Sequence, residues 1–377
     1  MNNFIPVNEP LLDGNEKKYL MECIDTGWIS SEGPFIKKFE EQMAKRVQRK
    51  YGVAVANGTA ALEIAIQALQ ITEGDEVILP TFTIISCAAA IVKAGAIPVF
   101  VDCDINTWNM DVTQIKEKIT SKTKAIMVVH IYGLPTDMDP VLELAKRYNL
   151  YVIEDAAEMH GQTYKGRPCG SFGDVSIFSF YPNKHITTGE GGMLLTNDAT
   201  LADRCKSLRN LCFKPERRFV HEEIGFNYRM TNMQAAIGVA QLERLDQFIV
   251  KKREMGALYT ELLSNVPGIQ LPLKNTSYSE NIYWVFGIVL KDELEVSLEE
   301  VINKLTQLGI GTRPFFWPMH KQPVLKKMGV CTLGNYPNSE IISRRGFYLP
   351  SGLNLNQEQI QYITLSFKKV IEEILNR

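Results

Sequence analysis

The chain has 377 residues, of which 45% are hydrophobic and 22% are charged, and its net charge is −2. This composition favours a globular protein of about two domains over a disordered chain. The charge offers no positive excess for nucleic acid or an anionic membrane surface, so neither partner is expected.

The longest apolar stretch, residues 84–101, does not resemble a membrane span. Lys93, Gly95 and Pro98 interrupt it, whereas a membrane helix needs about 20 largely apolar residues. After Met1, the segment "NNFIPVNEPLLDG" lacks the basic start and apolar core of a secretion signal. We therefore expect a cytoplasmic protein that does not enter a membrane.

Seven cysteines are scattered along the chain without a CxxC pair or a Cys/His cluster of zinc spacing. Their odd number and their scatter favour buried, reduced thiols, so no metal site and no cysteine nucleophile are predicted. They are Cys23, Cys87, Cys103, Cys169, Cys205, Cys212 and Cys331.

Apolar runs alternate with helical patterns in the first 155 residues. Strands are predicted at 51–57, 75–80, 96–102, 124–133 and 150–155, and helices at 59–69, 84–93, 112–119 and 138–148. Continuous apolar strands separated by helices predict an α/β fold with a mostly parallel sheet covered on both faces. Ligands bind such sheets at the carboxyl ends of the strands, where Asn57, His130 and Asp155 are expected.

The predicted strands and helices follow a different order in the second half of the chain. Strands at 174–180 and 191–197 form a shorter pair, with one member expected to be antiparallel, and a long helix is predicted at 232–255. A strand at 282–290, a helix at 298–308 and a closing helix from 357 then indicate a smaller α+β domain. The predicted division is a large domain of residues 1–250 and a small domain of residues 251–377.

The stretch "ANGTAALEIAIQAL" is a candidate phosphate site. Gly58 permits a tight turn after a strand, and the amides of Thr59 and Ala60 open a helix whose dipole favours an anion. The GxxxxGK[ST] pattern of a P-loop is absent. The alternative is an ordinary helix start with Thr59 as its cap.

The stretch "VIEDAAEMHG" places Glu154 and Asp155 at the end of a buried strand, with Glu158 three residues further on. An acidic residue in such a position can simply cap the next helix. Alternatively, its carboxylate faces a cationic ring nitrogen, because a desolvated carboxylate needs a positive partner to stay ionised.

The stretch "SFYPNKHITTGEGG" places Lys184 in a loop between a strand and a glycine-rich turn, after Ser179. Most lysines are solvated surface charges. A lysine held in a pocket, however, can lose its proton and form a Schiff base. An anion turn, a buried aspartate and this lysine, in this order, are what a pyridoxal phosphate enzyme needs to hold the phosphate, ring nitrogen and aldehyde.

With these motifs the sequence resembles the DegT/DnrJ/EryC1/StrS sugar aminotransferases, which have fold type I. The resemblance runs through "GTAAL", "GDEVILPTFTIISCAAAI", "VIEDAAE", "SFGDVSIFSFYPNKHITTGEGG" and "GFNYRMTNMQAAIGVAQL" to "GTRPFFWPMH". It implies a two-domain protein and a homodimer with active sites at the subunit interface. It also implies amino transfer from L-glutamate to a nucleotide-linked ketosugar, usually in O-antigen or other glycan biosynthesis.

The resemblance also implies roles for single residues. Lys184 matches the lysine that bonds pyridoxal phosphate, and pyridoxamine phosphate would form during turnover. Asp155 matches the partner of the ring nitrogen. Glu158 stands where many relatives carry a glutamine that binds the ring hydroxyl. The phosphate contacts match Gly58, Thr59, Ala60 and Ser179, with Asn227 from the neighbouring subunit.

Many relatives place an aromatic residue at Ile84, against one face of the cofactor ring. Here aliphatic packing by Ile84, or the ring of Phe82, must replace that stacking. Relatives that replace the lysine with histidine are pyridoxamine phosphate-dependent dehydratases. Lys184 keeps the "K-x-x-T-T-G-E-G-G" spacing of the aminotransferases, so His185 is expected to have a packing or substrate-edge role.

The stretches "WISSEGPFI" and "GIGTRPFFWPMHKQP" resemble the GDP-perosamine synthase branch, which aminates C4 of GDP-4-keto-6-deoxymannose. A dTDP- or UDP-linked 4-keto-6-deoxyglucose is the alternative substrate, and a 3-keto sugar a more distant one. Candidate substrate contacts, besides His185, are Trp28, Arg229, Arg313 and His320.

Two further alternatives come from other classes of protein. A non-catalytic protein that binds the cofactor would tolerate loss of Lys184 and Asp155, so their joint presence argues against it. A nicotinamide enzyme would need a GxGxxG turn after a strand, with an acidic residue about 20 positions further on, and this pattern is lacking.

Overall fold

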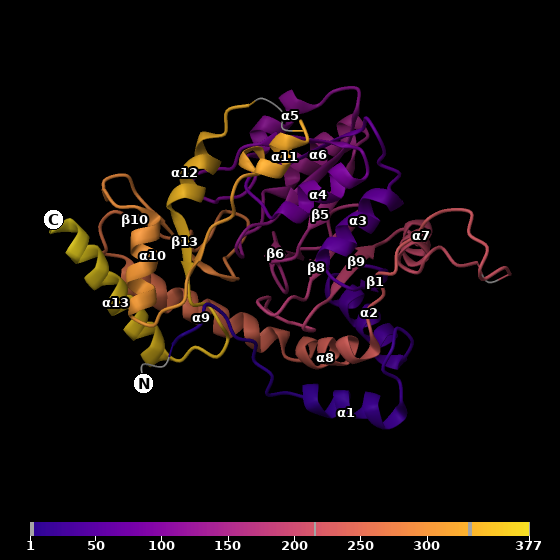
Figure 1. The fold of residues 1–377 in the computed structure, drawn as a ribbon, viewed down its shortest axis with the longest axis horizontal. Helices are drawn as coiled ribbons and strands as arrows, with labels where there is room; N and C mark the ends of the chain where they lie inside the picture. The colour runs from indigo at the N-terminus through magenta and orange to yellow at the C-terminus, as the bar shows by residue number, and fades with distance from the viewer. Residues whose placement is uncertain (1–3, 215, 331–333, 377) are drawn as a thin grey trace.

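The computed structural model describes residues 4–214, 216–330 and 334–376 (Figure 1). Its centre is a seven-stranded sheet with the order β1-β9-β8-β5-β4-β2-β3. β9 is antiparallel to its neighbours β1 and β8, and the four other pairs of neighbouring strands are parallel. The predicted mostly parallel sheet with one antiparallel member is thus confirmed. The strands are β1 (Tyr51–Val55), β2 (Glu76–Pro80), β3 (Ile97–Val101), β4 (Thr123–Val129), β5 (Tyr151–Asp155), β8 (Val175–Ser179) and β9 (Gly192–Thr196).

Helices cover both faces of this sheet because its strands are apolar on both faces. Val77 and Leu79 of β2 belong to one core, and Ile78 between them belongs to the other. The first core is covered by α3 (Gly58–Ala68), α4 (Ile85–Lys93) and α7 (Ala199–Arg209). The second is covered by α1 (Glu16–Thr26), α2 (Pro34–Arg46), α6 (Met138–Tyr148) and α8 (Asn232–Leu242), together with a short turn η1 (Val112–Gln114) and α5 (Ile115–Lys118).

The C-terminal part forms a smaller lobe around an antiparallel sheet of order β10-β11-β13-β12 (Figure 1). A third core lies between this sheet and three helices, and Ile5 joins it through a bridge to Ile310. The lobe comprises α9 (Leu245–Leu263), β10 (Ile269–Gln270), β11 (Phe286–Leu290), α10 (Leu298–Gln307), β12 (Arg313–Pro314), η2 (Met319–Lys321), α11 (Pro323–Lys327), α12 (Pro337–Arg345), β13 (Gly346–Leu349) and α13 (Gln357–Leu375). A small hairpin, β6 (Thr163–Tyr164) and β7 (Arg167–Pro168), lies apart from both sheets.

The single helix predicted at 232–255 is wrong, because the chain forms two helices there. α8 ends at Leu242 and α9 begins at Leu245, and Arg244 between them has a non-helical φ of −113°. Arg244 is the N-cap residue of α9, and its side chain forms an ion pair with Asp13. The break lets α8 pack against the large sheet while most of α9 packs in the small lobe. The proposed division between residues 250 and 251 falls within α9.

The strand predicted at 282–290 is also too long, since β11 begins only at Phe286. Tyr283 has a φ of +48°, which ends the extended run. Gly133 approaches this irregular segment so closely that an added Cβ would lie 2.7 Å from the backbone nitrogens of Tyr283 and Trp284. The segment therefore requires glycine at position 133, which itself has a φ of +104°.

We expect Gly133→Ala to destabilise the protein by about 3 kcal/mol or more, because backbone strain and a backbone clash act together. Gly166 is the matched control: its φ is +79°, but an added Cβ meets nothing within 4 Å. Gly166→Ala should cost only the conformational strain, about 1 to 2 kcal/mol. Denaturant unfolding of both variants measures the difference, and equal losses would contradict the close-approach argument.

None of the described helices is both long and apolar enough to cross a bilayer. The six cysteines that lie in the described residues are buried and free. Cys331, the seventh, lies outside the described residues.

Candidate active site

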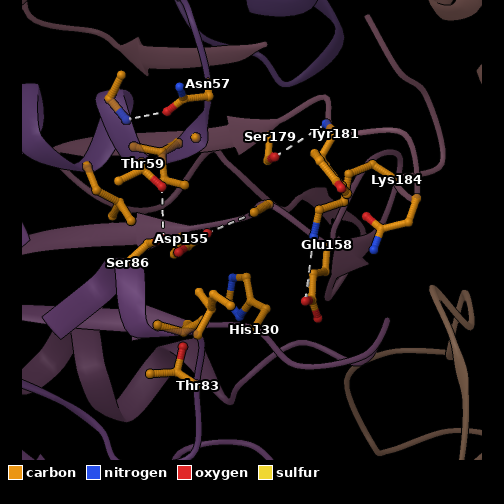
Figure 2. Close-up of a pocket in the computed structure, with 18 of the residues that line it drawn as sticks. Asn57, Thr59, Thr83, Ser86, His130, Asp155, Glu158, Ser179, Tyr181 and Lys184 are labelled. Carbon is orange, nitrogen blue, oxygen red and sulfur yellow. Dashed lines mark hydrogen bonds and ion pairs between the residues drawn. The ribbon is translucent and has the colours of Figure 1, made fainter. Parts of the chain in front are cut away.

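A cavity of about 710 Å³ lies at the carboxyl ends of β4, β5 and β8. Figure 2 shows Asn57 and Thr59 at one end of it, Lys184 with Glu158 at the other, and Asp155 between them. The structure thus brings together residues separated by more than 120 positions. The predicted residues that line the cavity are Gly58, Thr59, Ala60, Ile84, His130, Asp155, Glu158, Ser179 and Lys184.

The N-terminus of α3 forms the anion end of the cavity. Asn57 caps the helix: its Oδ1 accepts a hydrogen bond from Ala60 N at 2.8 Å, and its carbonyl accepts one from Ala61 N at 3.1 Å. The alternative in which Thr59 is the cap is therefore wrong. The Thr59 hydroxyl is instead 2.8 Å from that of Ser86.

This capping leaves the first amides of α3, those of Gly58 and Thr59, without a protein acceptor among the described residues. The Ser179 hydroxyl lies beside them, since a Cβ added to Gly58 would be 3.3 Å from Ser179 Oγ. Free amides, a helix dipole and a hydroxyl form a site that suits a phosphate.

Asp155 ends β5 and is buried. Its Oδ1 accepts a hydrogen bond from Ala157 N at 3.0 Å, and its Oδ2 accepts one from Cys87 Sγ at 3.3 Å. Burial nevertheless raises the pKa of this carboxyl, against the effect of those bonds and of Lys184. A cation bound in the cavity would favour the ionised form, so the carboxylate is suited to hold a protonated ring nitrogen.

Lys184 lies in the loop between β8 and β9, and its amine is 3.6 Å from Glu158 Oε1 and 3.9 Å from the ring centroid of Trp284. Burial lowers the pKa of Lys184, while the charges of Glu158 and Asp155 oppose that change. Burial likewise raises the pKa of Glu158 to about 7, although Glu158 Oε2 accepts a hydrogen bond from Tyr132 N at 2.7 Å. Burial therefore acts against both charges of this pair and favours the neutral amine of Lys184.

His185 points away from this cavity. It is buried, and its Nε2 is 3.3 Å from the carbonyl oxygen of Ile282. Burial lowers its pKa well below the usual range, so the imidazole is neutral. Of the two adjacent residues, Lys184 lines the cavity and His185 packs in the interior behind it.

Phe82 does not line the cavity. It is fully buried and packs against the rings of Tyr132, Phe315 and Phe316, with each centroid 6.0 Å away. Ile84 lines the cavity and is 43% exposed, so the chain presents an aliphatic surface at this position.

Asn227 and Arg229 also lie outside the main cavity. Asn227 is exposed, and its Oδ1 accepts hydrogen bonds from Arg229 at 2.7 and 3.1 Å. Arg229 lines a separate cavity of about 190 Å³, with Lys206 and Arg209. A role for Asn227 at the cofactor phosphate would have to involve the cavity of a second subunit, as the resemblance implies, and it stays a prediction.

The other candidate substrate contacts are dispersed in the single chain. Trp28 is 49% exposed after α1, and Arg313 is exposed in β12. His320 is buried, with Nδ1 2.7 Å from Thr81 Oγ1 and Nε2 3.1 Å from Glu340 Oε1. None of the three lines the main cavity, and their substrate roles stay predictions.

The structure adds cavity residues that the sequence analysis did not select. Trp284 and Tyr348 come from the small lobe, as does Phe316, and Tyr181 and Asn183 precede Lys184. The only sequence signal for Trp284 was its place in the aromatic run "IYWVFG", which suits an ordinary strand equally well.

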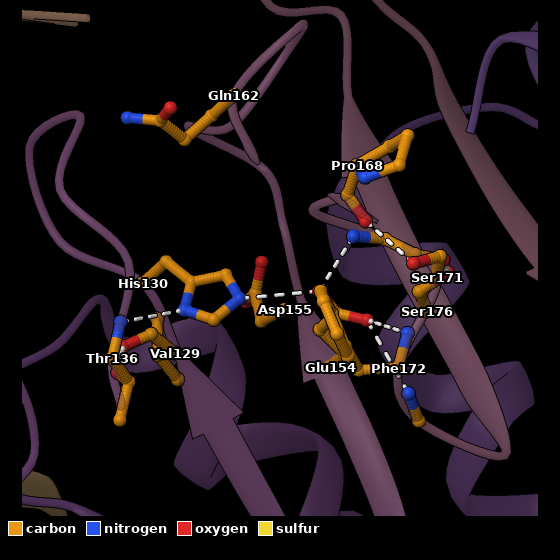
Figure 3. Close-up of polar contacts among 12 residues, drawn as sticks. Val129, His130, Thr136, Glu154, Asp155, Gln162, Pro168, Ser171, Phe172 and Ser176 are labelled. Atoms are coloured by element: carbon orange, nitrogen blue, oxygen red, sulfur yellow. Dashed lines mark hydrogen bonds and ion pairs between the residues drawn. The ribbon is translucent and has the colours of Figure 1, made fainter. Parts of the chain in front are cut away.

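His130, Glu154 and Cys169 place potential metal-ligand atoms within 4.8 Å of one another in the interior. Hydrogen bonds already account for the side chains of His130 and Glu154 (Figure 3). Glu154 accepts bonds from His130 Nε2 at 3.2 Å and from the amides of Gly170 and Phe172 at 2.5 and 2.8 Å. His130 Nδ1 accepts one from Thr136 N at 3.1 Å. The group therefore ties two loops to the end of β4.

Comparison with known proteins agrees with this geometry. The chain matches the DegT/DnrJ/EryC1/StrS aminotransferase family over residues 10–368. The GDP-perosamine synthase of Escherichia coli O157:H7 is 46% identical over 366 residues, covering 97% of this chain and 98% of that protein. The GDP-perosamine synthase of Vibrio cholerae is 44% identical over 359 residues, covering 95% and 97%.

A solved structure has the same fold. The putative sugar aminotransferase Spr1654 from Streptococcus pneumoniae, in its PLP form, has a TM-score of 0.91 at 26% identity, covering 98% of this chain and 99% of that one. The predicted fold class and the resemblance drawn from the motifs are confirmed. The chain belongs to the DegT/DnrJ/EryC1/StrS aminotransferase family and is an aminotransferase.

Proposed function

We propose that this aminotransferase binds pyridoxal phosphate and moves an amino group from L-glutamate to C4 of GDP-4-keto-6-deoxymannose, which yields GDP-perosamine. The observation that carries the proposal is one cavity with a phosphate-sized anion site at one end, the amine of Lys184 at the other and the carboxylate of Asp155 between them. The two GDP-perosamine synthases at 46% and 44% identity support the choice of sugar nucleotide.

The residues of the cavity fit this cofactor. The amides of Gly58 and Thr59 and the Ser179 hydroxyl would bind its phosphate. Asp155 is a buried carboxylate that lacks a cationic ligand, and a protonated ring nitrogen would supply one. Ile84 offers an aliphatic surface to the ring. When bound, the cofactor supplies an electron sink for the electron pair left at a carbon that loses a proton.

Lys184 carries the proton transfers in this account. Its amine accepts the proton from the α-carbon of the amino donor in the first half of the reaction, and it delivers a proton to C4 of the sugar in the second. The lowered pKa of the buried amine favours the neutral form that can accept a proton. The two substrates react in turn at one site, so the kinetics should be ping-pong, with pyridoxamine phosphate as the form between them.

A panel of substrates tests the function. Protein freed of pyridoxamine phosphate, reloaded with pyridoxal phosphate and given L-glutamate should convert GDP-4-keto-6-deoxymannose to a 4-amino sugar nucleotide, detected by mass spectrometry. Conversion of a dTDP- or UDP-linked 4-keto-6-deoxyglucose instead would keep the chemistry and replace the proposed substrate. Conversion of none of them would contradict the proposal.

We also propose that the enzyme acts in the cytoplasm as a homodimer with shared active sites. Apolar side chains that a folded monomer would leave in water support the dimer: Phe219 and Ile224 are 81% and 87% exposed, and Ile24 of α1 is 58% exposed. The loop that carries Phe219 and Ile224 projects from the body between α7 and α8 (Figure 1). In a dimer this loop would bring Asn227 to the neighbouring cavity.

Subunit mixing tests the shared site. Asn227→Ala should weaken cofactor binding by about tenfold, the loss of one hydrogen bond to a charged group. In a hybrid dimer with an inactive Lys184→Ala subunit, the Asn227→Ala subunit keeps Lys184 and receives Asn227 from its partner, so this one site should regain tight binding. In an equal mixture half of the dimers are hybrids, and the restored sites are about a quarter of all sites. Activity no higher than that of Asn227→Ala alone would argue that each chain completes its own site.

Glu158→Gln should change the pH dependence of stability in the cofactor-free protein. Burial raises the pKa of Glu158 from an ordinary value near 4.5 to about 7. The folded protein therefore binds this proton more tightly than the unfolded chain, and the resulting stability is lost as the pH rises through that range. The melting temperature of the wild type, compared with that of Glu158→Gln, should decrease as the pH is raised from about 5 to about 8. A difference in melting temperature that does not change with pH would show that Glu158 stays ionised in the folded protein.

A further inference from the structure

Trp284 is one of the side chains of the small lobe that line the active-site cavity. Its ring lies 3.9 Å from the amine of Lys184, and the side chain is 3% exposed. Its indole N–H donates a hydrogen bond to the carbonyl of Asn183, the residue before Lys184, at 2.7 Å. Trp284 therefore contacts both the reactive amine and the backbone that carries it.

The backbone of Trp284 is held in place by several independent contacts. Its carbonyl accepts a hydrogen bond from the amine of Lys252 in α9 at 2.7 Å, and the same amine binds the carbonyl of Ser351. Tyr283 N donates to Asn281 Oδ1 at 2.7 Å, which supports the positive φ of Tyr283. These contacts fix the segment before β11 although it is not part of a strand.

Lys252 is an unusual anchor. It is 2% exposed, and burial lowers its pKa to about 7. Its hydrogen-bond partners are the two carbonyls, with no carboxylate within ion-pair distance among the described residues. Burying a lysine in this way costs free energy, and it connects α9 to the segment after β13 and to the backbone of Trp284.

We propose that Trp284 is a positioning residue that holds the free amine of Lys184 beside Glu158, and that Lys252 fixes Trp284 for this task. The inference rests on the proposed function, in which the amine of Lys184 would be free of the cofactor while it moves protons. A released amine needs a defined position from which to move protons. The face of an indole ring attracts an ammonium group, and Glu158 Oε1 lies 3.6 Å from the same amine.

Other charged groups also face this amine, so the effect of the ring must be separated from theirs. Glu158 and Asp155 favour the ammonium form, while burial disfavours it. The titratable groups around Lys184 and Glu158 are Cys87, Tyr132, Asp155, His160, His185 and Tyr348. A substitution of Trp284 leaves all of them in place.

The test measures the pKa of Lys184 in the full-length protein freed of cofactor. Labelling with acetic anhydride over a pH series, followed by mass spectrometry of the peptide that contains Lys184, reports the fraction of free amine. Trp284→Leu removes the ring face and should lower the pKa by about one, a tenfold change in proton affinity. Trp284→Phe keeps a weaker ring face but loses the indole N–H, so the pKa should fall less. Trp317→Phe, at an exposed tryptophan, should leave the pKa unchanged.

Lys252→Met tests the anchor, because methionine keeps an apolar stem without the hydrogen bonds to Trp284 and Ser351. The pKa of Lys184 should fall in this variant as it does in Trp284→Leu. An unchanged pKa of Lys184 in folded Trp284→Leu and Trp284→Phe would overturn the role of the ring. An unchanged pKa in folded Lys252→Met, despite lower thermal stability, would overturn the role of the anchor. These pKa measurements need no turnover, so their outcome can be distinguished from a failure of the proposed function.

Discussion

Lys184→Ala should be inactive in amino transfer, with kcat lowered by about 10³-fold or more, because in the proposed mechanism one side chain provides both the bond to the cofactor and the proton transfers. The expectation follows from the position of the amine, 3.6 Å from Glu158 in the cavity that Asp155 also lines. Steady-state turnover of L-glutamate and the ketosugar measures the loss, and absorbance spectra of the loaded protein report the missing covalent bond.

Two variants control this experiment. Lys165→Ala removes an exposed lysine that is paired with Asp139, and it should turn over normally. His185→Asn changes a buried side chain behind the cavity, so it should affect stability more than kcat. If Lys184→Ala turned over at the wild-type rate while His185→Asn did not, the protein would act as a dehydratase-like enzyme.

Asp155→Asn should lower kcat by about 10²-fold or more, because a neutral amide cannot keep a ring nitrogen protonated as a carboxylate does. The amide is close in size to the carboxylate and can keep the bond from Ala157 N, so the fold should survive. A change in kcat with little change in thermal stability would separate the electrostatic role from a packing role.

Asp198→Asn is the matched control for this substitution. Asp198 caps α7 through Leu201 N at 3.0 Å, far from the cavity, and asparagine caps helices about as well. Both its activity and its stability should stay close to wild type. Wild-type kcat in Asp155→Asn would mean that the ring nitrogen is not held by this carboxylate.

The alternation of apolar runs and helical patterns was enough to predict the sheet and most of its helices. α6 has the predicted bounds, Met138–Tyr148, because its strongly amphipathic pattern ends at Asn149 in the left-handed conformation. Local signals failed where tertiary contacts decide the backbone. Arg244 interrupts the predicted helix and pairs with the distant Asp13, and Tyr283 leaves the strand in a segment packed against Gly133.

The cofactor end of the site could likewise be predicted, since Gly58, Thr59, Asp155 and Lys184 lie in short motifs at strand ends. Trp284 could not be, because it enters the cavity from the small lobe, 100 positions after Lys184, and its flanks look like an ordinary strand. Asn57 was assigned to the end of a strand, but only the structure shows that it, and not Thr59, caps α3.

The central claim is that Lys184 bonds the cofactor, and reductive trapping tests it most directly. Protein loaded with pyridoxal phosphate is reduced with borohydride, digested and mapped by mass spectrometry. The account predicts the added phosphopyridoxyl mass on Lys184, and none on Lys93 at the edge of the same cavity or on the buried Lys252. The mass on another lysine, or on no residue, would contradict it.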